Sequence, residues 1–229
     1  MERRGDISMK LLFNALIKYI CGLILVSLIL FGPAGTLVYP GAWLFIALLF
    51  IPMLILGTVL FLKAPELLAK RLNSREKEGT QKKVVGFTGL AFVASFVIAG
   101  LDYRFGWTKA PGWLVLVAAA IMLISYGLYA EVMRENAYLS RTIEVQENQK
   151  VIDTGLYGII RHPMYAATIL LFLSIPLVLG SWIAFVVMLT YPMGIIFRIR
   201  NEEEVLEQGL DGYAVYKKRV KYRLIPYVW

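Results

Sequence analysis

The chain has 229 residues, of which 59% are hydrophobic and only 17% are charged, and its mean hydropathy is +0.65. A soluble domain is closer to half apolar and a quarter charged, so this composition excludes an ordinary soluble enzyme. The chain has one cysteine, Cys21, and one histidine, His162. These counts exclude a disulfide framework and argue against CxxC redox chemistry and a metal-ligand cluster, so no metal is expected.

The apolar residues are arranged in six long blocks, and a run of about 20 apolar residues can cross a bilayer. The start, "MERRGDISMK", resembles the positive region of a signal peptide. The apolar run after it is too long for one, and five more blocks follow, so we expect a membrane span there. The sequence predicts an all-α, polytopic membrane bundle of about six spans, the last two forming a short hairpin with a tight turn at Gly180–Ser181. The blocks cover residues 11–31, 42–62, 84–101, 113–133, 164–179 and 181–197.

The basic residues are distributed unequally between the two sides of the membrane. Six spans put both termini on one side, and 21 of the 24 Lys and Arg residues fall on that side. Only Arg104 and Lys109 fall on the other side, while Lys18 lies inside the first span. The positive-inside rule therefore predicts cytoplasmic termini, and the net charge of +8 indicates contact with membrane lipids and not with nucleic acid. An aromatic belt is expected at the opposite interface, formed by Trp43, Trp107, Trp113 and Trp182.

The polar connections divide the chain into two predicted units. Residues 1–133 hold the N-terminal spans, and residues 134–229 hold a loop, the hairpin and a cytoplasmic helical tail. Within the first unit, residues 63–83 carry leucines beside Lys70 and Arg71 at helical spacing, which predicts a short amphipathic helix in the membrane interface. A plain basic linker is the alternative.

The second unit contains two segments whose local structure can be anticipated. We expect an irregular or briefly extended stretch around Val151–Ile152 that turns at Thr154–Gly155. After the sixth block, Arg198/Glu202 and Arg200/Glu204 are i,i+4 pairs, so a helix is expected to continue out of the membrane. Glycines at 209 and 212 should end it, and a second helix should begin near Tyr213.

The stretch "TGLYGIIRHPMY", residues 154–165, sets Arg161 and His162 directly before Pro163. Proline suits the first turn of a helix, where its missing N–H costs nothing. A helix N-terminus favours anions, so two basic side chains there could hold an anionic group. Snorkelling of basic side chains at the membrane boundary is the alternative explanation.

Polar and aromatic residues concentrate in 134–165 and 198–226. Arg198 and Glu202 share one helical face where the sixth block ends, and they could either bind a ligand or form a solvated ion pair. Four tyrosines could stack on a flat ring, or simply mark the interface: Tyr157, Tyr165, Tyr213 and Tyr216. Neither G-x-G-x-x-G nor G-x-x-x-x-G-K-[ST] is present, which excludes a Rossmann or P-loop cradle.

Joined in order, "GLYGIIRHPMY", an apolar hairpin, "RIRNEEEVL" and "GYAVYKKRVKYRLIP" resemble the isoprenylcysteine carboxyl methyltransferase and phospholipid N-methyltransferase superfamily of integral-membrane methyltransferases, in its prokaryotic branch. The resemblance covers roughly residues 142–229. It implies S-adenosylmethionine as cofactor, bound between the loop before the hairpin and the C-terminal helix. The residues that it assigns to cofactor binding are Lys150, Val151, Ile152, Tyr157, His162, Pro163, Tyr165, Glu202 and Glu203, and it assigns Arg198 to the methyl acceptor.

The resemblance implies methyl transfer to a lipid-like or prenylated acceptor at the cytoplasmic membrane face, in the plasma membrane of a prokaryote. A carboxylate or thiolate acceptor needs no general base, and Arg198 could hold it. An amine acceptor must lose a proton, and Glu202 or Glu203 is then the candidate base. Two alternatives remain open: a membrane NADPH-dependent reductase of the steroid-reductase type and a non-enzymatic membrane scaffold.

Overall fold

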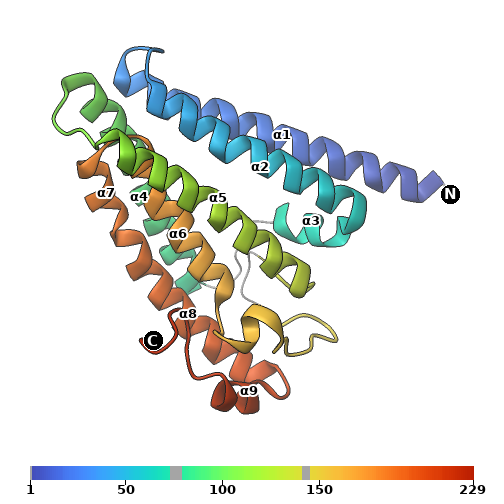
Figure 1. Cartoon of the computed structure of the whole chain (residues 1–229). Helices are drawn as coiled ribbons and strands as arrows, with labels where there is room; N and C mark the ends of the chain where they lie inside the picture. Colours follow the sequence, from blue (N-terminus) through green and yellow to red (C-terminus); the bar gives the residue numbers. More distant parts are fainter. Residues whose placement is uncertain (1, 73–78, 141–144) are drawn as a thin grey trace.

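The computed structural model describes residues 2–72, 79–140 and 145–229, and the side chains of residues 9–72, 84–140 and 145–229. All regular structure within these residues is helical, as predicted (Figure 1). The α-helices are α1 (Glu2–Ala34), α2 (Pro40–Lys63), α3 (Pro65–Leu72), α4 (Gly79–Phe105), α5 (Gly112–Glu135), α6 (Pro163–Val178), α7 (Trp182–Met188), α8 (Thr190–Gly209) and α9 (Tyr213–Arg219). A short 3-10 helix, η1, covers Gly155–Gly158.

Five stretches among the described residues are long and apolar enough to cross a membrane: Met9–Ala34, Pro40–Lys63, Val84–Phe105, Gly112–Glu135 and Trp182–Gly209. They correspond to five of the six predicted blocks, and the protein is an integral membrane protein. The remaining block is α6, which has only 16 residues. At about 1.5 Å per residue it is shorter than a usual span, so the exact number of crossings stays a prediction.

The last predicted block forms two successive helices, α7 and α8, with a break at Leu189 between them. Pro192 explains the break, because it has no N–H to donate to the carbonyl of residue 188. α6 returns to α7 through a tight turn at Gly180, whose φ is +83°, and Ser181 then caps α7. The predicted hairpin is therefore confirmed.

The two ends of the bundle are built differently. In Figure 1 the α1–α2 and α4–α5 connections and the start of α7 lie at one end, and α3, the connection before α6 and α9 lie at the other. The predicted helix in 63–83 is confirmed as α3, whereas residues 73–78 of that prediction lie outside the described residues. The Lys18 side chain donates to the carbonyl of Leu72 at 2.6 Å, which satisfies one free acceptor at the end of α3.

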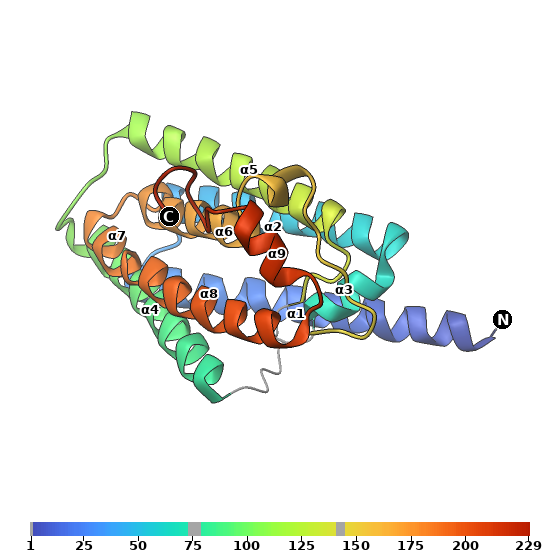
Figure 2. The ribbon, with the colours of Figure 1, turned by 90° about the horizontal axis from the view of Figure 1, so that it is seen from below.

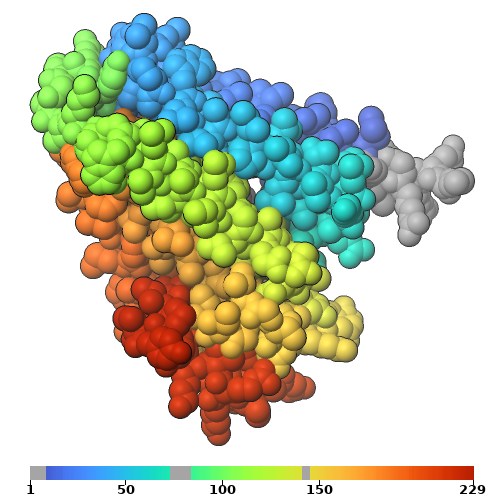
Figure 3. Space-filling view, viewed as in Figure 1, coloured from blue at the N-terminus to red at the C-terminus, as the bar shows by residue number. Residues whose placement is uncertain are grey.

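A single apolar core joins the two units that the sequence analysis separated. Leu30, Phe45 and Phe96, from α1, α2 and α4, belong to the same buried cluster as Leu171 and Ile175 from α6. Figure 2 shows α6 lying between α5 and α8, and Figure 3 shows α5 and α6 in contact along their length. The N-terminal helices therefore support the hairpin directly, which fixes the end of the molecule where the polar residues gather.

Candidate functional site

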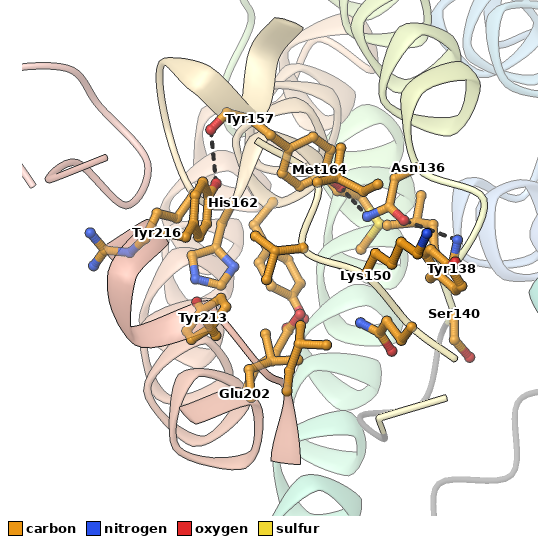
Figure 4. A pocket seen from close by; sticks show the side chains of 18 of the residues that line it. Asn136, Tyr138, Ser140, Lys150, Tyr157, His162, Met164, Glu202, Tyr213 and Tyr216 are labelled. Carbon is orange, nitrogen blue, oxygen red and sulfur yellow. Dashed lines mark hydrogen bonds between the residues drawn. The ribbon is translucent and has the colours of Figure 1, made fainter. Parts of the chain in front are cut away.

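A pocket lies at the end of the bundle that holds α9 and the connection before α6. The empty space within it is about 860 Å³, which includes the solvent-filled mouth of the pocket (Figure 4). Three segments line it: the connection between α5 and η1, the start of α6, and the α8–α9 region. The lining residues are Asn136, Tyr138, Leu139, Ser140, Gln149, Lys150, Val151, Ile152, Tyr157, Arg161, His162, Met164, Tyr165, Arg198, Glu202, Leu206, Leu210, Tyr213 and Tyr216.

The start of α6 is fixed by backbone contacts to the C-terminal tail. Pro163 occupies the first helical position, as predicted. The backbone N–H groups of the two preceding residues, like those at any helix start, have no acceptor within the helix. Arg161 donates its N–H to the carbonyl of Tyr222, and His162 donates its N–H to the carbonyl of Arg223, both at 2.9 Å. The tail therefore completes one wall of the pocket.

The two basic side chains at this helix start share a carboxylate from the chain itself. Arg161 Nε donates to Glu203 Oε1 at 2.7 Å, and His162 Nε2 lies 3.2 Å from the same oxygen. Arg223 contacts the other oxygen through Nε and Nη2, both at 2.9 Å. Glu203 is only 2% exposed, and Arg161 and His162 are 6% and 5% exposed. The sequence analysis left open an anionic group or snorkelling for these two side chains, and in the structure they contact the carboxylate of Glu203.

A second polar chain crosses the floor of the pocket. The Tyr165 hydroxyl accepts from Arg198 Nε at 2.9 Å and donates to Glu202 Oε2 at 2.5 Å. Hydrogen bonds that involve an ionised group are about twice as strong as neutral ones. Tyr165 therefore fixes the orientation of both charged side chains, for which the sequence analysis left ligand binding and a solvated ion pair open.

Three buried tyrosines surround the rest of the cavity, and Figure 4 shows Tyr157, Tyr213 and Tyr216 on the side away from Ser140. Tyr216 donates its hydroxyl to the carbonyl of Tyr157 at 2.8 Å, and Asn136 Nδ2 donates to the Tyr157 hydroxyl at 3.0 Å. Burial raises the pKa of Tyr157, Tyr213 and Tyr216 above the usual phenol value. All three are neutral phenols near pH 7, so their rings can stack and their hydroxyls can hydrogen-bond.

The Tyr213 hydroxyl differs from its neighbours because, among the described residues, it is the buried side-chain polar atom that has no hydrogen-bond partner. A buried hydroxyl left unpaired costs about 1–3 kcal/mol, so such groups are rare in folded proteins and call for an explanation. Because Tyr213 lines the pocket, a polar atom of a bound molecule would supply the missing partner.

The loop that closes the pocket depends on a contact with the end of α5. Glu135 Oε2 accepts the N–H of Leu156 at 3.1 Å and so caps η1. Gly155 has a φ of +52°, and a side chain on it would collide with the Glu135 carboxylate. Only glycine fits this position, and the predicted turn at Thr154–Gly155 corresponds to the start of η1.

Most of the residues that the resemblance assigned to the site line this pocket. They are Lys150, Val151, Ile152, Tyr157, His162, Tyr165, Arg198 and Glu202. Pro163 and Glu203 lie behind the wall. The residues that sequence reasoning missed are Asn136, Tyr138, Leu139, Ser140, Met164, Leu206 and Leu210. Asn136 had a signal, because it follows the last residue of α5 and lies in the predicted loop, but the others look like ordinary loop and helix residues.

Comparison with known proteins gives a family for this part of the chain. Residues 113–211 match the family model described as phospholipid methyltransferase. The family that this model describes is part of the superfamily of integral-membrane methyltransferases that the sequence resembles. The matched segment starts at α5, earlier than the resemblance seen in the sequence, and ends before α9, so it contains every lining residue of the pocket except Tyr213 and Tyr216.

A curated relative is named for a reductase activity and not for methyl transfer. The chain is 30% identical over 91 residues to the Delta(14)-sterol reductase TM7SF2 of Mus musculus. The alignment covers 38% of this chain and 22% of the relative, so the chain spans only about a fifth of the relative's length. Such a partial likeness does not assign the reductase activity to this chain.

Proposed function

We propose that the protein transfers a methyl group from S-adenosylmethionine to a lipid-like or prenylated acceptor. The observation that carries this proposal is the Arg198–Tyr165–Glu202 chain on the floor of a pocket built mainly by the methyltransferase segment. The pocket lies where α8 passes from apolar residues to charged ones, so an acceptor could reach it from the bilayer. The excess of Lys and Arg at this end supports a cytoplasmic position, with both termini on that side in the membrane of a prokaryote.

The residues present fit the proposed cofactor. The Tyr213 hydroxyl lacks a partner, and neutral tyrosine rings can stack on an adenine or face a cation. Glu202 provides a carboxylate on the floor. Lys150, Val151 and Ile152 would border the adenine with Tyr157, and His162, Tyr165 and Glu202 would line the remainder. When bound, S-adenosylmethionine supplies a methyl group activated by its positively charged sulfur.

The side chains of the protein would then act mainly by positioning. Arg198, held by Tyr165, would orient the acceptor, and holding two reactants in line contributes much of the rate in such displacements. A carboxylate or thiolate acceptor would need no base, whereas an amine would pass its proton to Glu202. Glu203 is less suited to that role, because both of its oxygens already contact basic side chains, so we assign it to holding the start of α6.

The test is calorimetric titration of the purified protein with S-adenosylmethionine, S-adenosylhomocysteine and NADPH. We expect the two adenosyl ligands to bind, and Glu202→Gln and Tyr165→Phe to weaken that binding or abolish transfer. Tyr165→Phe keeps the ring and removes one hydroxyl. The predicted loss of binding free energy is about 1.5–3 kcal/mol, or a roughly 10- to 150-fold weaker affinity. Glu204→Gln is the matched control, because Glu204 lies on the same helix and is exposed.

The reductase is retained as a second candidate because of the sterol reductase relative. Binding of NADPH in place of the adenosyl ligands would favour it. Well-folded protein that binds none of the three ligands would contradict both enzymatic proposals and leave the scaffold.

A further inference from the structure

Residues 224–229 fold into a closed hook that has no part in the pocket lining. The Trp229 carbonyl accepts the backbone N–H groups of Arg223 and Leu224 at 2.9 Å and of Ile225 at 3.1 Å. The N–H groups of Val228 and Trp229 return to the Ile225 carbonyl, each at 3.1 Å. Tyr227 adopts a φ of +65° to make the bend. This 224–229 hook is therefore a defined structure with a stem and a tip.

The stem of the hook is buried against the membrane hairpin. Leu224 is 8% exposed and belongs to the apolar cluster that contains Tyr165 of α6 and Ile195 and Ile199 of α8. Trp229 packs against the same cluster. Figures 1 and 2 both show the C-terminal end beside α6 and α8, whereas α9 lies at the far end of the bundle in Figure 1. The hook is thus set back from the pocket end, toward the membrane.

The level of the hook along α8 coincides with the edge of the apolar region. Phe197, between Ile195 and Ile199, is 61% exposed and faces the bilayer, and Arg198 and Arg200 follow at once. A change from exposed apolar to charged residues within one turn marks the boundary between hydrocarbon and headgroups. The hook lies beside this boundary.

The tip of the hook is apolar and exposed. Ile225 is 55% exposed, Tyr227 is 88% exposed and Val228 is 75% exposed, and Pro226 between them is also exposed. Together with Trp229, this gives the mixture of aliphatic and aromatic side chains that accumulates at membrane interfaces. In water these side chains would cost free energy, whereas at the interface their burial is favourable.

The residues before the tip carry only positive charge. Residues 212–229 contain five Lys and Arg residues and no Asp or Glu. Lys218 and Lys221 are exposed, while Lys217 and Arg219 pair with Glu207 and Asp153. Near an anionic leaflet, exposed basic residues add to the attraction between the protein and the membrane. This charge is complementary to anionic headgroups.

We propose that the 224–229 hook is a membrane-interface anchor, which places Ile225, Tyr227 and Val228 among the headgroups of the leaflet on the pocket's side and uses Lys221 to contact anionic lipids. The backbone of residues 222 and 223 is hydrogen-bonded to Arg161 and His162, and Arg161 also donates to the carbonyls of Val220 and Lys221. The anchor therefore holds the pocket wall level with the headgroups. This proposal does not depend on the reaction catalysed.

The experiment uses the full chain with Cys21→Ser, which removes the one cysteine. Tyr227→Cys is labelled with an environment-sensitive fluorophore in nanodiscs of phosphatidylcholine, with or without phosphatidylglycerol. Val215→Cys is the matched control, because Val215 is 73% exposed on α9. Val228→Cys provides a second position in the hook, should labelling at Tyr227 disturb folding.

We expect the label at residues 227 and 228 to show blue-shifted emission, quenching by nitroxide-bearing lipids and loss of quenching by aqueous iodide. The label at residue 215 should show no blue shift, should be quenched by aqueous iodide and should not be quenched by nitroxide-bearing lipids. Lys221→Gln should reduce the extra protection that phosphatidylglycerol gives. Equal iodide quenching at 215, 227 and 228 in both lipid mixtures would overturn the proposal. Protection seen in native membranes but not in nanodiscs would also overturn it, and would indicate a protein partner.

Discussion

The two ends of the bundle each bury one carboxylate, but they surround it differently. Asp102, 1% exposed, accepts from the Thr108 N–H at 2.6 Å and from the hydroxyls of Thr108 and Ser181. Glu203, 2% exposed, contacts Arg161, His162 and Arg223. The Asp102 cluster thus joins α4 to the α6–α7 turn through neutral donors, and the Glu203 cluster joins α8 to α6 and the tail through basic groups.

The difference supports our proposal of a ligand site at the Glu203 end. At the Asp102 end the donors are the backbone N–H and hydroxyl of Thr108 and the hydroxyl of Ser181, and the cluster closes the bundle. At the Glu203 end, long basic side chains hold one wall of a cavity that also contains a partnerless Tyr213 hydroxyl. Buried polar groups stabilise both ends, and within the described residues the Glu203 cluster holds Arg161 and His162, which line the pocket.

The largest effect is expected from Glu203→Gln, which keeps the volume and removes the charge. Removing one partner of a buried ion pair typically costs about 3–5 kcal/mol, because the other charge stays buried without compensation. Here Arg161 would lose its charged partner. Thermal unfolding in detergent should shift strongly downward, and binding of S-adenosylhomocysteine should be lost with it.

Glu204→Gln provides the control for this prediction, since the residue is adjacent and exposed. Surface substitutions of this kind usually change the free energy of unfolding by less than about 0.5 kcal/mol. Equal melting temperatures for the two variants would show that the Glu203 cluster does not hold the pocket wall.

Asp102→Asn should have an intermediate effect on stability and none on ligand binding. Asn keeps one acceptor oxygen but turns the other into a donor group, so at least one of the three hydrogen bonds to Asp102 is lost. The expected loss of unfolding free energy is about 1–3 kcal/mol. Calorimetry should give the same dissociation constant for S-adenosylhomocysteine as in the unaltered protein. A weaker ligand affinity without any change in melting temperature would break the contrast between the two ends.

Much of the fold could be predicted because hydrophobic length, turn residues and helix boundaries are local. The spans, the hairpin turn at Gly180, α3 and the break between α8 and α9 all follow from such patterns. Gly212, with a left-handed φ of +83°, lies in that break directly before α9. The break between α7 and α8 at Leu189 also had a local signal in the sequence, Pro192. Contacts between distant segments, such as Tyr222 with Arg161, had none, because they depend on where the tail folds.

The role of Glu203 shows what spacing could have revealed. Tyr191, Ile195, Ile199 and Glu203 recur every four residues, and all four are buried on the same face of α8. Glu203 therefore continues an apolar stripe, whereas Glu204 lies off it. The sequence placed three successive carboxylates near the site, and helical phase separates the buried one from the exposed one. Helical phase does not identify Arg161 and Arg223 as the partners of Glu203, since these arginines come from other segments.

The smallest and most selective effect is expected from Tyr213→Phe. Because the hydroxyl has no partner within the described residues, its removal should leave the melting temperature unchanged or slightly raised. If a ligand supplies the missing hydrogen bond, the same change should weaken S-adenosylhomocysteine binding by about 0.5–1.5 kcal/mol, or roughly 2- to 13-fold. Tyr216→Phe is the matched control, because its hydroxyl already donates to the Tyr157 carbonyl. It should lower stability and affect the ligand only through the position of Tyr157. A ligand affinity unchanged in Tyr213→Phe would mean that this hydroxyl meets water in the complex, and that the open end of the pocket does not close over the ligand there.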